Sequence, residues 1–401
     1  MAIKAGQILH DVHGFVIDRI QTAGVSNVNI PETKIYELGN FKTVATVRDI
    51  PDLSFNLESF DVSCEIEAIL TGVDPTTITN HQEFDFANHV PVDVISPFKA
   101  GTNQYNIVKG IALPYLTMER AVYKFGMKND ATQTYTMRGD SIYYVPGTPY
   151  TQTFTNTGAS TYSFSHTAIE YVESGSSHYA LNVCAINTST NLYKRLALGT
   201  HYTNTSTGFT MLTDISAQYN KLRVTFGSAT AASYPQSVHQ NVSIKPAAVR
   251  GKDIDVYIGD SSATPVFTRW TGVQSVDVTR SVTLQNDEEF GNSHFVSSDY
   301  DVADVSGNIT MKPIDPADLW DRLAQIANVA TNKIIGPYTS VFLPVEIRIS
   351  NPDTGAVVKT LYIPDARFKI PGVNGRVQQK VETQIPFSSD GGTLLVYNGT
   401  R

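Results

Sequence analysis

The chain has 401 residues, a formal net charge of −8, and charged residues make up only 17% of it. This acidic balance argues against a protein whose task is to grip nucleic acid, and the two cysteines, Cys64 and Cys184, are too few for a disulfide framework or a four-cysteine zinc site. No stretch has the apolar run of a signal peptide or a membrane span, so we expect a chain of two or three domains that is made and folded in the cytosol.

In chain order, residues 1–23 predict an arm with a short strand at 15–17. Residues 24–57 predict three strands joined by two turns, with Gly39 and Asn40 in the first turn because Gly-Asn suits the positive φ angles of hairpin loops. Apolar and polar side chains alternate from residue 53 to residue 58, which predicts a strand with one buried face. A short helix at 63–70 and a strand pair at 111–125 and 133–145 complete this half.

The middle of the chain differs in composition. About residues 149–245 are rich in Thr, Ser, Asn and Tyr, and short strands are expected at 162–171, 179–185, 208–212 and 221–226. Such spacing is typical of a small antiparallel sandwich. Lys194 and Arg195 are isolated basic residues there, and we expect them on the surface.

The second half repeats a frame from the first. The order Asp, aliphatic, any, Asp, aliphatic, Ser, any, Asn, aliphatic occurs at 49–57 and again at 301–309, an offset of 252 residues (301 − 49). Asp301 and Asp304 therefore match Asp49 and Asp52. A repeat at this spacing indicates a duplicated domain and not a solenoid.

Other parts of the repeat keep the same order. Gly291 and Asn292 echo the first Gly-Asn turn, and residues 272–278 resemble residues 24–30 at an offset of 248 (272 − 24). A helix follows at 319–326, opened by Asp315 and Pro316, and then strands at 345–349, 360–363 and 375–387. We expect copies at 1–148 and 248–401, with an insertion at 149–247.

The paired aspartates are the clearest candidates for chemistry. Two carboxylates could cleave a glycan as general acid and base, but Asp side chains also cap turns, and duplication favours the structural role. His10 and His13 lack the further ligands of a metal site, and no P-loop, Gly-x-Ser-x-Gly or His-Glu-x-x-His motif occurs. We therefore predict no catalytic, cofactor or metal residues, and eight residues in structural or assembly turns: Gly39, Asn40, Asp49, Asp52, Gly291, Asn292, Asp301 and Asp304.

The repeated unit resembles the tail tube proteins of long-tailed bacteriophages. The resemblance rests on residues 34–40, the aspartate-frame strand, a helix and a closing strand pair, and again on 282–309, 319–326 and 368–387. It implies a mainly β chain with two tandem antiparallel β-sandwich or barrel domains, each with a short flanking helix. The insertion would be a small immunoglobulin-like sandwich, an outer decoration that a flexible linker could replace without loss of the tube.

The same resemblance implies a structural virion protein, assembled in the host cytoplasm, whose rings stack into the conduit for DNA ejection. Its partners would be two further copies in a homotrimeric ring, the tape measure protein, the tail terminator, baseplate or tip proteins, and double-stranded DNA in transit, with no membrane and no cofactor. Three chains are expected because single-domain relatives form six-membered rings and this chain supplies two domains. The alternative is a carbohydrate- or receptor-binding surface protein that uses the Tyr- and Asn-rich insertion.

Overall fold

The computed structural model describes residues 11–17, 19–36, 43–60, 62–99, 107–127, 129–173, 176–229, 249–289, 294–312, 316–326, 340–369, 372–374 and 382–401. The chain is mainly β and is built on large antiparallel sheets, as expected. One connected sheet of 18 strands contains strands from both halves of the described chain, and the middle segment forms smaller sheets of its own.

The strands fall into three units and a hairpin. The N-terminal unit contains β1 (Asp11–Val12), β2 (Phe15–Val16), β3 (Ile20–Asn29), β6 (Asp52–Ser59), α1 (Glu65–Leu70), β7 (Glu83–Asp85), β8 (Val92–Lys99), β9 (Ile107–Gly126), β10 (Asn129–Gly139) and β11 (Tyr143–Val145). The C-terminal unit contains β21 (Ile254–Gly259), β22 (Phe267–Trp270), β23 (Val273–Asp287), β24 (Ser297–Met311), α2 (Pro316–Ile326), β25 (Val341–Ser350), β26 (Val357–Phe368), β27 (Gly372–Asn374), β28 (Glu382–Ser389) and β29 (Leu395–Asn398).

The two units have the same strand order. Pairing runs β3-β6-β10-β9-β8-β1-β2 in the N-terminal unit and β23-β24-β28-β26-β25-β21-β22 in the C-terminal unit. Irregularities in the ladder recur as well, between Val92 and Val94 in the first unit and between Leu343 and Val345 in the second. The helix stands at the same point of each unit, α1 after β6 and α2 after β24.

Register corrects one part of the expected repeat. Gly24 lies opposite Asn56, and Asp277 lies opposite Asn308, the residue that matches Asn56 in the aspartate frame. Gly24 therefore corresponds to Asp277 and not to Gly272, and the offset here is 253 residues (277 − 24). The sequence match of 24–30 with 272–278 is therefore out of register by five residues.

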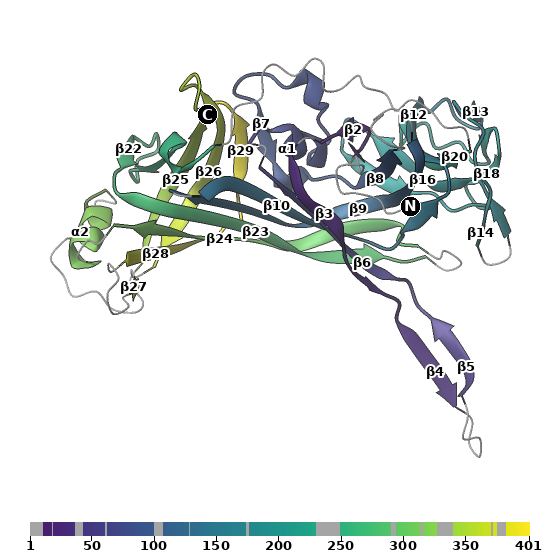
Figure 1. Ribbon diagram of the computed structural model, residues 1–401, viewed down its shortest axis with the longest axis horizontal. Helices are drawn as coiled ribbons and strands as arrows, with labels where there is room; N and C mark the ends of the chain where they lie inside the picture. Colours follow the sequence, from purple (N-terminus) through teal and green to yellow (C-terminus); the bar gives the residue numbers. More distant parts are fainter. Residues whose placement is uncertain are drawn as a thin grey trace.

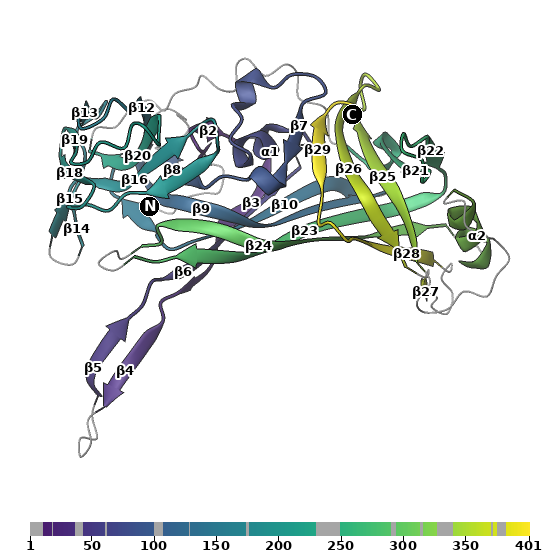
Figure 2. The ribbon, with the colours of Figure 1, turned by 180° about the vertical axis from the view of Figure 1, so that it is seen from behind.

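The units join edge to edge through β9 and β23. The two strands pair antiparallel from Gly126 opposite Ser275 to Arg120 opposite Ser281. The result is one continuous sheet that arches along the long axis of the molecule (Figures 1 and 2). We call it the main sheet, and its strand order is β3-β6-β10-β9-β23-β24-β28-β27.

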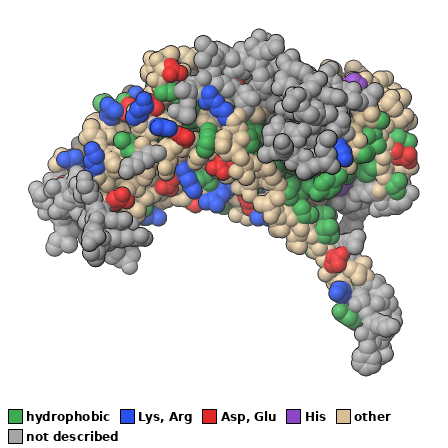
Figure 3. All heavy atoms as spheres, viewed as in Figure 1, with side chains coloured by type: hydrophobic (Ala, Val, Ile, Leu, Met, Phe, Trp, Pro, Cys, Tyr) green, Lys and Arg blue, Asp and Glu red, His purple; other side chains and the backbone are tan. Residues whose placement is uncertain are grey.

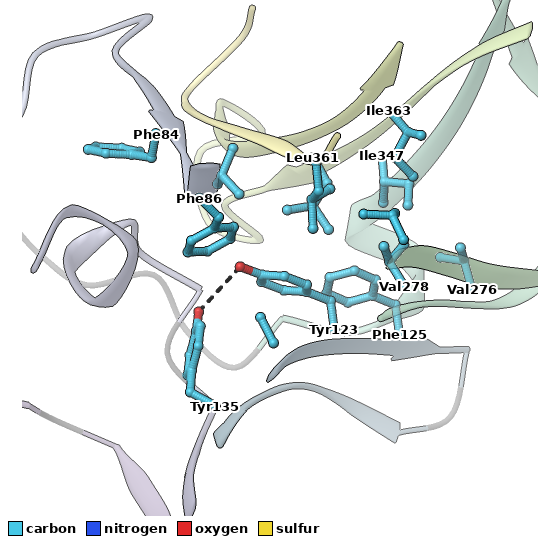
Figure 4. Packing of buried hydrophobic residues seen from close by; sticks show 14 of the residues in the cluster. Phe84, Phe86, Tyr123, Phe125, Tyr135, Val276, Val278, Ile347, Leu361 and Ile363 are labelled. Atoms are coloured by element: carbon cyan, nitrogen blue, oxygen red, sulfur yellow. Dashed lines mark hydrogen bonds between the residues drawn. The ribbon is translucent and has the colours of Figure 1, made fainter. Parts of the chain in front are cut away.

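The core is shared between the units. Tyr123 and Tyr135 from the N-terminal unit pack in one cluster with Val278, Ile347 and Leu361 from the C-terminal unit (Figure 4). A second strand pairing supports this contact, since β7 pairs with β29 across the units. Because the apolar side chains of each unit are buried partly against the other, the two copies behave as one folded body.

The inserted unit has its own core. A four-stranded sheet, β12-β20-β16-β17, and a three-stranded sheet, β13-β19-β18, both contribute to it, with Phe209, Phe226 and Val224 fully buried. The expected strand at 162–171 is two separate strands, β13 and β14, while the three later strands are found close to their predicted bounds. The strands are β12 (Thr148–Thr155), β13 (Thr161–Ser163), β14 (Tyr171–Glu173), β15 (Ser176–His178), β16 (Ala180–Asn187), β17 (Leu192–Arg195), β18 (Tyr202–Thr205), β19 (Gly208–Met211) and β20 (Lys221–Ser228).

A two-stranded arm leaves the body between β3 and β6. It consists of β4 (Glu32–Tyr36) and β5 (Thr43–Arg48), and it extends away from the rest of the molecule (Figure 1). Pro31 and Pro51 stand where its two strands leave the main sheet. Proline has no N–H to donate to a ladder, so the sheet is interrupted at both points. We call β4 and β5 the hairpin arm.

Candidate functional site

One face of the main sheet is uncovered, while α1, β7, β8 and the inserted unit lie on the other side (Figures 1 and 2). The alternation predicted for β6 explains this, because Leu53, Phe55 and Leu57 are buried and the residues between them are not. Cross-strand partners share a face, so the register identifies the uncovered side chains. We call them the polar face, in which Val122 and Pro386 are the apolar members: Thr22, Gly24, Ser54, Asn56, Glu58, Thr134, Thr136, Arg138, Arg120, Val122, Lys124, Asp277, Thr279, Ser281, Asp304, Ser306, Asn308, Gln384, Pro386 and Ser388.

Carboxylates lie next to cations on this face of the sheet. Arg138 of β10 bonds Asp52 through Nη1 and Glu119 through Nε, each at 2.9 Å, and Lys124 lies opposite Asp277 across the joint. Partial burial raises the pKa of Asp277, and Lys124 offsets part of that rise. In Figure 3 side chains of both charge signs are visible along the hollowed lower edge of the body. The face is hydroxyl- and amide-rich, with its charges largely matched.

Only some of the eight predicted turn residues lie in the described ranges. Gly39, Asn40, Gly291 and Asn292 fall outside the described residues. Asp49 stands at the base of the hairpin arm, where its carboxylate accepts a hydrogen bond from the Ile50 N–H at 2.8 Å, and Asp52 begins β6. These two aspartates lie at the entry of β6.

The second aspartate pair does not form a turn. Asp301 and Asp304 lie inside the continuous strand β24, and Asp301 accepts a hydrogen bond from Gln285 of β23 at 3.1 Å. The expectation of a second strand entry was wrong, because the C-terminal unit lacks prolines at the positions of Pro31 and Pro51 and its ladder continues. Asp52 and Asp304 are four strand spacings apart, about 19 Å, too far for a pair of glycosidase carboxylates.

Buried charges fix the joint between the units. Lys359 of β26 donates to Glu67 of α1 at 2.6 Å, and both side chains are fully buried. Tyr123 and Tyr135 also donate to Glu67, at 3.0 and 2.8 Å. Arg280 of β23, 2% exposed, donates to the carbonyl of Phe86 at 3.1 Å. The Lys359–Glu67 and Arg280–Phe86 contacts link the N-terminal to the C-terminal unit, while the two tyrosine hydroxyls hold Glu67 in place within the N-terminal unit.

A first buried ion pair anchors the inserted unit. Arg223 of β20 donates to Asp93 of β8 at 2.7 Å, and both side chains are 1% exposed. Burial would raise the pKa of Asp93, but Arg223, the Tyr115 N–H and Thr225 together hold it below its usual range. His13 lies 2.9 Å from Arg223, and burial and the Arg223 charge lower its pKa to about 3. His13 is therefore a neutral neighbour of this pair.

A second buried ion pair involves all three units. Arg195 of β17, expected on the surface, is 3% exposed and donates to both oxygens of Asp140 at 2.7 and 2.9 Å. From the C-terminal unit, the Phe295 N–H donates to Asp140 at 2.8 Å, and the Arg195 N–H donates to the Val296 carbonyl at 3.0 Å. The inserted unit thus holds the end of the β23–β24 hairpin against the N-terminal unit.

The same cluster contains Ser141, His294 and Asp140, a set known from hydrolases. Ser141 Oγ lies 3.1 Å from Nδ1 of His294, and Asp140 approaches that same nitrogen at 3.6 Å. A catalytic triad needs serine and aspartate on opposite ring nitrogens. Since Asp140 is also engaged by Arg195, the cluster has the geometry of a docking contact and not of a charge-activated nucleophile.

Sequence reasoning missed these buried pairs. Arg223 and Lys359 stand in apolar strand patterns, and a cation at a position predicted to be buried is the one signal that could have marked them. Nothing local to Asp93 or Asp140 identifies their partners, which lie 130 and 55 residues away.

No protein-family model matches the chain, and no curated protein matches it by sequence. Among the residues that the structure describes, no group of three or more His, Cys, Asp and Glu side chains could hold a metal ion. None of the helices in the described ranges has the length and apolar character needed to cross a membrane.

Proposed function

We propose that the chain is a structural subunit that assembles into rings of three and stacks these rings into a tube, the tail tube of a long-tailed bacteriophage. The observation that carries this proposal is the main sheet. It consists of two matched halves, has one uncovered polar face, and ends in a strand edge on each side. A sheet with two open, complementary edges invites head-to-tail association, and a closed ring removes both edges.

The estimated diameter of a ring of three chains is large enough for double-stranded DNA to pass through it. Eight strands from each of three chains give twenty-four, and at a spacing of about 4.8 Å and a tilt of about 40° they close a barrel with a backbone diameter of about 48 Å. Such a bore admits double-stranded DNA. The polar face lines it, and its hydroxyls, amides and matched charges allow DNA to pass because few unpaired cations are available to bind phosphate.

The hairpin arm is the proposed stacking element. Isolated two-stranded hairpins are marginally stable in water, and this one exposes Ile35 and Tyr36 at 44% and 62%, with Val28 and Ile30 at its base. Figure 3 shows apolar side chains where the arm leaves the body. In the tube the side chains of Ile30, Ile35 and Tyr36 are buried against a neighbouring ring.

The inserted unit, an immunoglobulin-like decoration in this proposal, lies on the side of the main sheet away from the bore. Further partners are the tape measure protein inside the tube and the terminator and tip proteins at its ends.

Electron microscopy of the purified protein tests the proposal. We expect rings with threefold symmetry that stack into tubes. Compact single particles at all concentrations, or rings of six chains, would contradict it.

A further inference from the structure

The internal joint between the two units predicts the joint between two chains. We infer that β3 of one chain pairs antiparallel with β27 of a second copy, in the register of β23 on β9, with Gly24 opposite Asn374. The inference rests on the proposed function and adds the residues that make the contact.

The register follows from the duplication. In the internal joint, Asp277 of β23 lies opposite Lys124 of β9. Gly24 is the counterpart of Asp277, as the pairing with Asn56 and Asn308 showed.

Asn374 is the counterpart of Lys124 by the same reasoning. Lys124 pairs with Thr132 of β10, and Asn374 pairs with Glu382 of β28, the residue that corresponds to Thr132 at an offset of 250 (382 − 132). Strand directions also agree, since β3 runs with β23 and β27 runs with β9 in the main sheet. Repeating the internal contact therefore places Gly24 beside Asn374.

Both strands have the edge that this contact needs. Within the described residues, β3 pairs only with β6, and β27 pairs only with β28. Their counterparts β23 and β9 have partners on both sides over the same stretch. Over this stretch the outer edges of β3 and β27 therefore lack the second unit that pairs with β23 and β9.

Side-chain exposure indicates where the second copy lies. Arg280 is 2% exposed because it is covered by Phe86 of the other unit, whereas its counterpart Val28 is 47% exposed. These two residues correspond because they face Val305 and Leu53, which match in the aspartate frame. The N-terminal unit therefore exposes the apolar Val28 at the position where the C-terminal unit buries Arg280.

Two further positions show the same contrast. Lys359 is fully buried on Glu67, whereas Lys109, its counterpart in β9 at an offset of 250 (359 − 109), is exposed. Val396 of β29 is buried against Phe84 of β7, whereas Tyr144, its counterpart in β11, is 75% exposed. All three exposed residues belong to the N-terminal unit, and each has a counterpart buried against a neighbouring unit. The C-terminal unit of a second copy covers them.

Disulfide trapping in the full chain tests the register. The variant Gly24→Cys with Asn374→Cys is assembled under reducing conditions and then oxidised. A Cβ at Gly24 meets no atom within 4 Å, so the substitution fits, and Cys64 and Cys184 are buried. We expect linked dimers and a closed covalent trimer on a non-reducing gel, and none from either single variant.

Two control pairs calibrate the result. Lys124→Cys with Asp277→Cys reproduces the internal contact and should link within one chain. Asn29→Cys with Asn374→Cys is four ladder positions out of register, since Asn29 lies opposite Asp52 and Gly24 opposite Asn56, and at about 13 Å it should not link. If threefold rings form and the internal pair links but Gly24→Cys with Asn374→Cys does not, the register is wrong while the proposed function stands. If no rings form in the wild-type chain, the proposed function fails and the inference fails with it.

Discussion

At the scale of single residues, the charges that matter most are those that water does not reach. Arg223–Asp93, Arg195–Asp140 and Lys359–Glu67 are all buried, and each links two units of the chain. Removing water from two ions is costly, so such pairs contribute little net stability but strongly disfavour any arrangement that separates them. Their main effect is to select one docking arrangement of the units.

Replacing one partner of a buried pair should therefore destabilise the fold more than replacing both partners with apolar residues. Arg223→Met leaves Asp93 buried without its cation, and we expect a loss of about 3–5 kcal/mol in the free energy of unfolding by denaturant titration. The double variant Arg223→Met with Asp93→Leu should recover most of that loss. Arg138→Met is the exposed control, with an expected loss of about 1 kcal/mol or less. Equal losses for Arg223→Met and Arg138→Met would contradict the role assigned to the buried pair.

Acid should destabilise the chain well before its carboxylates titrate. The pKa of His13 is lowered from 6.5 to about 3 in the fold, so between these values the unfolded chain binds a proton that the folded chain does not. The contribution of His13 to the free energy of unfolding is therefore complete above pH 6.5 and is lost as the pH is lowered toward 3. Unfolding free energies of the wild type and His13→Gln between pH 7 and 4.5 check this. The variant should show the shallower decline.

Replacing the frame aspartates should have small effects. Asp49→Ala and Asp301→Ala each remove one hydrogen bond at an exposed position, so we expect a loss of about 1 kcal/mol or less in thermal or denaturant unfolding. A hydrolytic activity that either change abolishes, with the fold intact, would contradict a structural role.

At the scale of elements, the same two strands end differently in the two units. β23 and β24 stay paired out to Asp287 and Ser297, whereas β3 and β6 separate into the hairpin arm at Pro31 and Pro51. The helices and the strand alternation could be predicted from the sequence because they depend on local periodicity. The β9–β23 pairing could not, since it joins residues about 150 positions apart and no local pattern specifies a partner.

Tyr144 tests the proposed joint at this scale. Tyr144→Asp would bury a carboxylate between chains, at a cost of about 3 kcal/mol or more per joint, and should shift rings to monomers in size-exclusion chromatography. Val172→Asp is the matched control, because Val172 is 68% exposed but lies on the inserted unit. As single chains, both variants should have the same free energy of unfolding as the wild-type chain. Rings formed equally by both variants would place Tyr144 outside the joint.

The hairpin arm should separate ring closure from stacking. Replacing residues 32–48 with a short Gly-containing turn removes none of the core residues that the structure describes, so chain stability should change by about 0.5 kcal/mol or less. We expect single rings that do not extend into tubes in electron micrographs. Full-length tubes from this variant would mean that the arm has no part in stacking.

At the scale of the whole molecule, the inserted unit is tied to the other two units by buried charges. It supplies both arginines of the Arg223–Asp93 and Arg195–Asp140 pairs and bonds the C-terminal unit through Val296. The duplication itself was visible in the sequence through one nine-residue frame. The docking was not, because the burial of an arginine depends on a partner supplied by another unit.

Exchanging residues 148–228 for a flexible linker should accordingly destabilise the remaining chain. Asp93 and Asp140 would lose their cations, at about 3–5 kcal/mol for each orphaned charge in denaturant unfolding. Adding Asp93→Asn and Asp140→Asn to the shortened chain should restore part of the loss. A shortened chain as stable as the wild type would show that the two pairs are dispensable.

The hairpin arm also sets a symmetry. In the proposed ring the two units of each chain would be near-equivalent walls. A smooth barrel built from them could be rotated by any multiple of 60° without a marked change in its rims. Within the described residues only the N-terminal unit carries an arm, so the proposed ring of three chains would present arms 120° apart. Of six rotations that would otherwise be nearly degenerate, three bring the arms onto equivalent units of the ring below. Gene duplication followed by divergence of one hairpin would thus have converted a sixfold object into one with a defined helical phase between successive layers.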